Sequence, residues 1–149
     1  MKARRPLPPT VLLFAIIVLV AVHVLAPRLH VVPFPVNLLG LLPLAAGAWL
    51  NLAADRLLKR HQTTVKPFQD SAALVTTAVY SHTRHPMYLG FVLILLGIAV
   101  LLGSAWPFLV VAVFPALMEL LYIRVEERML RERFGEAWAA YRARVRRWL

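Results

Sequence analysis

Two clusters of ionisable and aromatic side chains are the part of this sequence best suited to chemistry. The first is Tyr80-Ser-His-Thr-Arg-His-Pro-Met-Tyr-Leu-Gly90, and the second is Arg124-Val-Glu-Glu-Arg128. Between Met87 and Met118 the chain carries no charged residue. The clusters therefore flank an apolar stretch long enough for two membrane-length segments, which places both clusters at one membrane face. This arrangement indicates a single site with chemistry as well as anchoring.

The first cluster has the residue types of a binding site at the start of a helix. Pro86 is favourable at a first helical position, because the N–H that it lacks would have no intrahelical partner there. The helix start exposes free N–H groups and the positive end of the helix dipole, and His85 and Tyr88 are close enough along it to share a pocket. An ordinary interfacial belt of Arg, His and Tyr explains the same residues equally well. His82 and His85 do not indicate a metal pair, because the chain has no cysteine and few suitable acids.

The acids in and just after the last apolar segment point to a cationic ligand. Glu119 is the only acid inside an apolar segment, where a carboxylate is costly, usually faces the bundle interior and marks function. Glu119, Tyr122 and Glu126 recur at i, i+3 and i+7, so they share one helical face, which we expect to point at the first cluster. The structural alternatives are a neutral or hydrogen-bonded Glu119 and a solvated Glu126-Glu127 pair. A cationic cofactor beside these acids would use them well.

The composition indicates one all-α integral membrane domain over residues 1–149. Of the 149 residues 60% are hydrophobic, and the mean hydropathy is +0.69, both above the values of an ordinary soluble domain. The absence of cysteine excludes disulfides, thiolate metal sites and cysteine nucleophiles. The formal net charge of +10 comes from basic residues beside apolar segments, which indicates contact with anionic lipid rather than with nucleic acid.

Four membrane-spanning helices are predicted, with a polar loop and a polar tail. The predicted spans are 10–26, 36–54, 87–102 and 105–123, with a cytoplasmic loop over 55–86. Prolines end the first span, and Pro43 is a candidate kink in the second. Gly103-Ser104 makes the last two spans a tight antiparallel hairpin. The tail 126–149 repeats large apolar residues at spacings of three and four between arginines, which predicts an amphipathic helix on the cytoplasmic surface or capping the bundle, with a break at Gly135.

Charge fixes the predicted orientation. With four spans, every basic residue except Arg28 lies on one side of the membrane, whereas three or five spans would scatter them. The excess of positive charge marks the cytoplasmic side, so both termini are expected there, in a bacterial inner membrane. The start Met1-Lys-Ala-Arg-Arg5 resembles a signal peptide, but no convincing cleavage motif follows, which favours an uncleaved first span.

The two clusters together resemble the isoprenylcysteine carboxyl methyltransferase family, which belongs to a wider group with the phospholipid N-methyltransferases. The resemblance covers about residues 60–147 and rests on a combination of motifs rather than on one. These are Leu74–Gly90 with its R-H-P-x-Y-x-G pattern, Glu126-Glu-Arg-Met-Leu130, Phe134-Gly135 and Tyr141, with Thr63-Thr-Val-Lys-Pro67 as the T-T-V-x-P element of bacterial members. The sequence is interpreted as a bacterial member.

The resemblance implies an integral membrane enzyme that uses S-adenosyl-L-methionine on a lipophilic acceptor, by analogy a prenylcysteine-type carboxylate. It implies no nucleic-acid partner and no obligate protein partner. The implied cofactor contacts are Ala72, Ala73, Leu74, Val75, Tyr80, His85, Pro86, Met87, Tyr88 and Glu126, with Glu127 less certain. Glu119, Tyr122 and Arg124 are candidates for the substrate side. The arginine that contacts the substrate carboxylate in eukaryotic members is replaced here by Tyr122, and the nearest base is Arg124.

Other functions fit parts of the same pattern. A phospholipid N-methyltransferase or a thiol S-methyltransferase would use the same cofactor site. A membrane reductase that uses NADPH is a further alternative, because some sterol reductases share a similar C-terminal arrangement. A basic membrane anchor without catalytic activity would bind no cofactor. A carboxylate acceptor is already ionised at pH 7 and needs no base, whereas an amine must lose a proton, for which Glu119 or His85 is placed.

Overall fold

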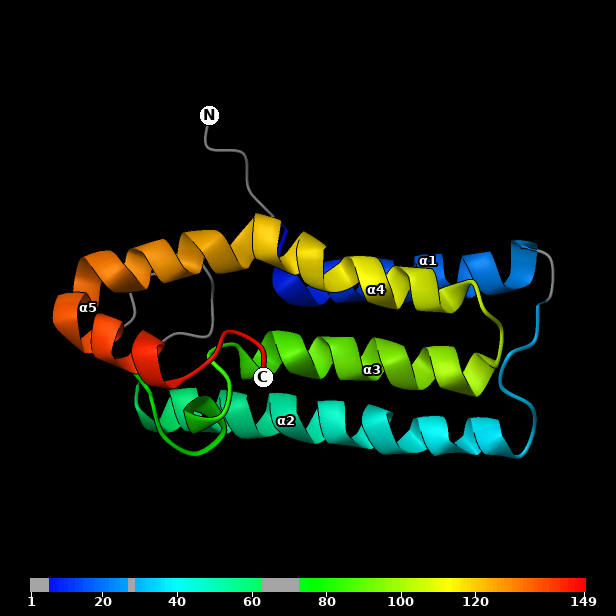
Figure 1. The fold of residues 1–149 in the computed structure, drawn as a ribbon, viewed down its shortest axis with the longest axis horizontal. Coiled ribbons are helices and arrows are strands. Elements are labelled where there is room, and N and C mark those ends of the chain that lie inside the picture. Colours follow the sequence, from blue (N-terminus) through cyan, green and yellow to red (C-terminus); the bar gives the residue numbers. More distant parts are fainter. Residues whose placement is uncertain (1–5, 27–28, 63–72) are drawn as a thin grey trace.

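The computed structural model describes residues 6–26, 29–62 and 73–149, and this part of the chain is almost entirely helical (Figure 1). The apolar helices run side by side, and the last of them continues into a polar extension. The elements in chain order are α1 (Pro8–Leu25), the 3₁₀ turn η1 (Val36–Gly40), α2 (Leu41–Arg60), the 3₁₀ turn η2 (Ala78–Ser81), α3 (Pro86–Leu102), α4 (Pro107–Met118), the π-helical turn η3 (Glu119–Ile123) and α5 (Arg124–Arg144).

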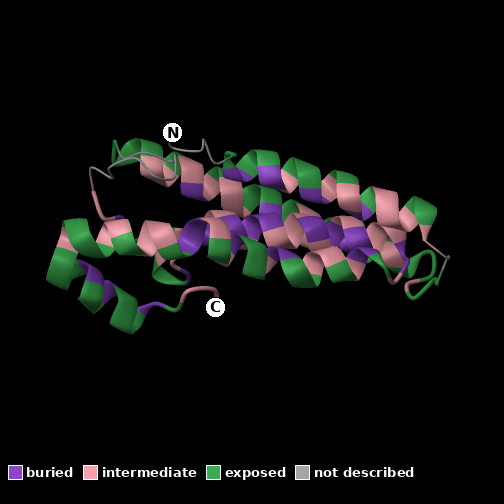
Figure 2. Ribbon diagram, turned by 90° about the horizontal axis from the view of Figure 1, so that it is seen from above, coloured by how far each residue is buried: buried purple, intermediate pink, exposed green. Residues whose placement is uncertain are grey.

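Helix α3 is the centre of the bundle. It contacts α1, α2 and α4, and the buried residues gather along the middle of the bundle in Figure 2. Leu95 and Ala99 of α3 are fully buried, as are Leu19 of α1 and Met118 of α4. Three neighbouring helices therefore fix the position of α3 in the bundle.

The outer surface of the bundle is apolar in the way that lipid contact requires. Large hydrophobic side chains are exposed along α1, α2 and α4, for example Phe14 at 65%, Leu42 at 68% and Val113 at 63%. Three helices of the described chain are long and apolar enough to cross a membrane: Pro8–Leu25, Val36–Arg60 and Pro107–Arg144. Helix α3 is apolar but has 17 residues, which is the lower limit for a span. An integral membrane protein is thus supported, and the count of four spans stays a prediction.

Two pairs of glycines allow α2 and α3 to pack at close range. A Cβ atom at Gly47 would lie 2.5 Å from the carbonyl oxygen of Gly90, and one at Gly40 would lie 2.5 Å from that of Gly97. Gly90 and Gly97 are seven residues apart on one face of α3, and they face Gly47 of α2 and Gly40 at the end of η1. In a membrane the hydrophobic effect does not drive helices together. Small residues instead let two helix backbones approach closely and gain van der Waals packing energy.

The end of the bundle away from the polar clusters is closed by hydrogen bonds. Gly103 ends α3 in the left-handed conformation, with φ of +72°, which a glycine adopts without steric cost. Its carbonyl oxygen accepts from the N–H groups of Val31 and Val32 at 2.9 and 3.1 Å. Ser104 Oγ lies 2.7 Å from His23 Nδ1. The predicted turn at Gly103-Ser104 therefore also anchors the connection between α1 and α2.

Proline and glycine shape α2 and the long last helix. Pro43 is the third residue of α2, just after the 3₁₀ turn η1, so the helix begins there instead of kinking. Pro115 lies within α4, where it removes one i→i−4 hydrogen bond, and the π-helical turn η3 begins four residues later. At Gly135 the backbone leaves the helical region, with φ of 49° and ψ of −117°, and the chain folds back.

Two predicted boundaries shift. Helix α2 continues to Arg60, so the first residues of the predicted loop 55–86 are helical. Helix α5 ends at Arg144, and Val145 is in an extended conformation. The last five residues turn back toward the start of α3, where Arg84 N–H donates to the carbonyl oxygen of Arg146 at 3.0 Å. The apolar spacing that suggested a helix to residue 149 reflects instead the burial of Val145 beside Trp138 and Tyr141 and the partial burial of Trp148 against the bundle core.

The glycine contact predicts a large difference between neighbouring positions of α2. Gly47→Val places a side chain against the α3 backbone and is expected to cost about 3 kcal/mol or more through overpacking. Ala48→Val adds similar volume on the exposed side of α2 and is expected to be nearly neutral. Thermal unfolding in detergent, followed by circular dichroism, measures both. Equal transition temperatures would show that α2 and α3 do not pack this closely.

Candidate active site

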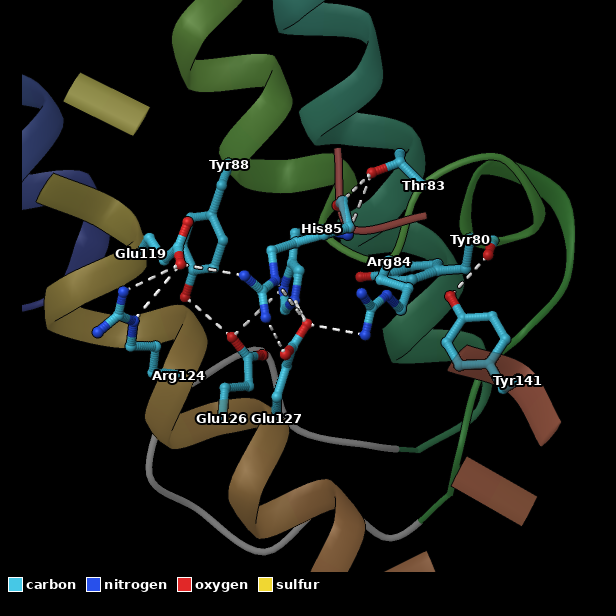
Figure 3. A network of polar contacts seen from close by, with 11 residues as sticks. Tyr80, Thr83, Arg84, His85, Tyr88, Glu119, Arg124, Glu126, Glu127 and Tyr141 are labelled. Atoms are coloured by element: carbon cyan, nitrogen blue, oxygen red, sulfur yellow. Dashed lines mark hydrogen bonds and ion pairs between the residues drawn. The ribbon is translucent and has the colours of Figure 1, made fainter. Parts of the chain in front are cut away.

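The structure brings the start of α3 and the start of α5 into direct contact (Figure 3). Tyr88 Oη donates a hydrogen bond of 3.2 Å to Glu126 Oε2. His85 Nε2 lies 3.2 Å from Glu127 Oε1. These residues are 38 and 42 positions apart in the chain, so the apolar hairpin between them is what places them side by side.

Glu127 is the most enclosed carboxylate of this site. Its side chain is 12% exposed, and Arg84 Nη1 lies 2.9 Å from Oε1. Arg147 donates from Nη2 to Oε2 at 2.7 Å and from Nε to Oε1 at 3.1 Å. Burial raises the pKa of the Glu127 carboxyl, but the hydrogen bonds from His85 and Arg147 and the charge of Arg84 outweigh it, and the pKa falls to about 2. Glu127 is therefore ionised, and both of its carboxylate oxygens already have partners.

Glu126 is next to Glu127 in sequence but has few partners. Tyr88 is its one hydrogen-bond donor within the described chain, and His85 Nδ1 lies 3.8 Å from Oε2. The Glu126 side chain is 35% exposed. A carboxylate has about four acceptor positions, so Glu126 keeps most of its capacity for a ligand.

Aromatic rings line the approach to Glu126. The rings of His85 and Tyr88 stack with centroids 5.7 Å apart, and those of Tyr88 and Tyr122 stack at 6.2 Å. Tyr122 is fully buried and its hydroxyl donates to the carbonyl oxygen of Pro6. Tyr122 therefore supports Tyr88 from behind, and its hydroxyl is engaged with the chain before α1.

Glu119 is paired rather than isolated. Arg147 Nη1 donates to Glu119 Oε1 at 3.0 Å, and Arg124 Nη2 lies 3.4 Å from the same oxygen. The Glu119 side chain is 26% exposed. The contacts agree with the structural alternative in which Glu119 is hydrogen-bonded. Arg147 contacts both Glu119 and Glu127.

The tail after Gly135 holds the first cluster from the other side. Tyr141 Oη donates to the carbonyl oxygen of Tyr80 at 2.6 Å, and burial raises the pKa of this phenol to about 12, so it is a neutral donor at pH 7. The guanidinium of Arg84 lies over the ring of Trp138 at 5.7 Å. Thr83 Oγ1 donates to the carbonyl oxygen of Arg147 at 3.0 Å. The returning chain thus fixes both Arg84 and Arg147.

Three of the other residues expected at the cofactor can be placed by their position or packing. Pro86 is fully buried at the first position of α3, and Met87 is half-buried beside it. Leu74 packs on the cluster formed by Trp138, Tyr141 and Val145, with Ala73 and Val75 on either side of it in the chain. Ala72 and the element 63–67 lie outside the described residues. No group of three His, Asp or Glu side chains suited to a metal ion occurs in the described ranges.

Two arginines were not among the site residues expected from sequence. Arg84 belongs to the motif that carries the resemblance, yet arginine at a membrane face is so common that its type alone gave no signal. Arg147 lies 20 residues after Glu127, in a tail with many arginines. The turn of the chain at Gly135 brings this arginine to Glu127, and the sequence alone does not show which arginine will reach it.

Comparison with known proteins identifies the family of the chain. A sequence model described as phospholipid methyltransferase matches residues 36–137, which is more than half of the chain. The chain belongs to this family. The resemblance predicted from the two motifs is therefore confirmed at the level of the wider group, and membership makes this protein a membrane methyltransferase at the family level.

A bacterial relative shares part of the chain. It is an uncharacterized protein of Haemophilus influenzae, 38% identical over 63 residues, which are 42% of this chain and 100% of the relative. It agrees with the prediction of a bacterial member. No solved structure gives a significant match.

The depressed pKa of Glu127 predicts a loss of stability in acid. Because its folded-state pKa of about 2 lies below the reference value of 4.5, the ionised carboxylate stabilises the fold above pH 4.5, and this contribution is lost as the pH falls toward 2. Glu127→Gln is expected to cost about 3 kcal/mol at pH 6 and to flatten the dependence of stability on pH between 4.5 and 2.

Denaturant unfolding in detergent, followed by tryptophan fluorescence across this pH range, measures the effect. Glu136→Gln, which changes an exposed glutamate of α5, is the matched control and should keep the wild-type profile. Identical profiles for the Glu127 and Glu136 variants would contradict the proposed ion cluster.

Proposed function

We propose that this protein transfers a methyl group from S-adenosyl-L-methionine to a lipophilic acceptor at the cytoplasmic face of the membrane. The observation that carries the proposal is the contrast between the two adjacent acids. Glu127 is occupied by Arg84, His85 and Arg147, whereas Glu126 is partly exposed with one hydrogen-bond donor in the described chain. A carboxylate left in this state beside aromatic rings suits a small organic cation.

The donor set around Glu126 fits both charges of this cofactor. The sulfonium is a cation that Glu126 and the stacked rings of His85 and Tyr88 would stabilise. The amino-acid part of the cofactor carries a carboxylate, and Arg84 Nε is a buried donor without a hydrogen-bond partner in the described chain. Buried donors are normally satisfied, so a bound anionic group is a suitable partner for Arg84.

The cofactor would supply an activated methyl group, and the protein would align the reactants and exclude water from them. Transfer from a cationic donor to an anionic acceptor neutralises charge, so exclusion of water favours the reaction. Tyr88 and His85 are 6% and 5% exposed, and their hydrogen bonds to the two acids hold them rigidly. These residues align the reactants, which is a large part of what a methyl transfer without an added base needs.

A carboxylate acceptor follows from the resemblance to isoprenylcysteine carboxyl methyltransferases. It is ionised at pH 7, so no residue of the site needs to remove a proton. The acceptor would come from the lipid phase, since the outer surface of the bundle is apolar.

An amine head group is the second candidate acceptor. The arginines around the acids are already paired: Arg124 with Glu119, Arg84 with Glu127, and Arg147 with both acids. An acceptor carboxylate would have to compete with these glutamates, whereas an amine would not. The match to a phospholipid methyltransferase model supports the same candidate. An amine must first lose a proton, and Glu119 or His85 is the candidate acceptor. For Glu119 this role requires release from its contacts with Arg147 and Arg124.

Cofactor binding tests the assignment of the acids. Glu126→Ala and His85→Ala are expected to abolish binding of S-adenosyl-L-methionine in isothermal titration calorimetry, because they remove the available carboxylate and the ring that stacks beside it. Glu126→Gln keeps the shape and the hydrogen bond from Tyr88, and it is expected to lose more than tenfold in affinity through loss of charge.

Glu132→Ala, on the exposed surface of α5, is the control and should bind as the wild type does. Normal affinity in both Glu126→Ala and His85→Ala would overturn the site. Displacement of bound ligand by NADPH but not by S-adenosyl-L-methionine would favour a reductase, and absence of binding by either would favour a membrane anchor.

Isotope labelling identifies the acceptor. Membranes that contain the protein are incubated with deuteromethyl cofactor, and the lipid extract is analysed by mass spectrometry before and after treatment with base. A carboxyl methyl ester loses its label to base as methanol, whereas an N-methyl group keeps it. Glu126→Ala membranes are the control, and equal labelling in both membranes would contradict the proposed reaction.

A further inference from the structure

An open groove lies between α2 and the segment that leads into α3. It has a volume of about 680 Å³, within the range of sites that bind small molecules. It runs along the charged end of α2 and the 3₁₀ turn η2. Its lining residues include Trp49, Leu50, Ala53, Arg56, Leu57 and Arg60 of α2.

The wall of the groove is apolar and its rim is cationic. Nearly all of its exposed surface is apolar. Arg56 and Arg60 stand one helical turn apart on α2, both exposed, and neither has an acidic partner among the described residues. The nearby Asp55 is paired with Lys59 at 2.6 Å. Two adjacent unneutralised guanidinium groups beside an apolar channel call for an anionic amphiphile.

The position along α2 agrees with this chemistry. The helix is apolar and exposed at Trp49 and Leu52, and it carries its charges only from Asp55 to its end at Arg60. The groove therefore extends from the depth of the hydrocarbon to the depth of the head groups, where tryptophan and arginine are favoured. Basic side chains at this depth attract anionic lipid.

We propose that this groove binds an anionic phospholipid of the surrounding membrane. One acyl chain would lie along Leu50, Ala53 and Leu57, and the phosphate would lie between Arg56 and Arg60. Segment 83–89 separates the groove from the acids, because Thr83 and Leu89 line the groove while His85 and Tyr88 contact Glu127 and Glu126. The lipid would therefore brace the outer side of the helix start that bears the candidate active site. This binding does not depend on methyl transfer.

Native mass spectrometry of the intact protein in detergent tests the proposal. Palmitoyl-oleoyl phosphatidylglycerol is expected to give a bound lipid at concentrations roughly tenfold lower than the phosphatidylcholine of the same chains. Arg56→Gln with Arg60→Gln should remove this preference. Arg128→Gln with Arg131→Gln removes the same charge from exposed positions of α5 that do not line the groove, and it should keep the preference.

A second variant tests the apolar part without touching the charges. Ala53→Trp fills the groove and should weaken phosphatidylglycerol binding about as much as the double arginine variant. Ala48→Trp, exposed on α2 outside the groove, should not. Circular dichroism verifies the fold of each variant. Equal binding of the two lipids by the wild type, or equal loss in the Arg56/Arg60 and Arg128/Arg131 variants, would overturn the proposal.

Discussion

Glu127 is a carboxylate shielded from water, and the rest of the site depends on how its charge is balanced. Arg84 and His85 come from the start of α3, and Arg147 comes from the returned tail. Each of these groups would be costly to bury alone, but together they satisfy one another. The cluster therefore fastens three distant segments at one point, and it does so at the polar end of an otherwise apolar bundle.

This fastening leaves the neighbouring acid available. With Glu127 held by arginines, Glu126 faces Tyr88 and the stacked rings, and its carboxylate keeps acceptor capacity. One acid thus serves structure and the next is placed for a ligand. Rigid support from Tyr122 behind Tyr88 matters because a methyl transfer aligned by the protein tolerates little misplacement.

The bundle itself is held by means suited to lipid. Close approach of α2 and α3 at two glycine pairs gains packing energy where apolar side chains gain little by leaving lipid. At the other end of the bundle, the hydrogen bonds of the Gly103 turn pair backbone groups that would otherwise be unsatisfied near the membrane. Both features hold α3 at a fixed depth, and with it His85 and Tyr88.

The sequence by itself determined the class of protein and supplied the candidates for the site. Apolar segments, the placement of basic residues, and the motifs around His85 and Glu126 predicted a helical membrane protein of the methyltransferase group, because these signals are local or periodic. It could not decide the different states of Glu126 and Glu127, the contribution of Arg147, the contact of Gly47 with Gly90 or the groove beside Arg56. Those depend on how distant helices are aligned and on where the chain turns at Gly135, and only the tertiary structure brings such non-local groups into contact.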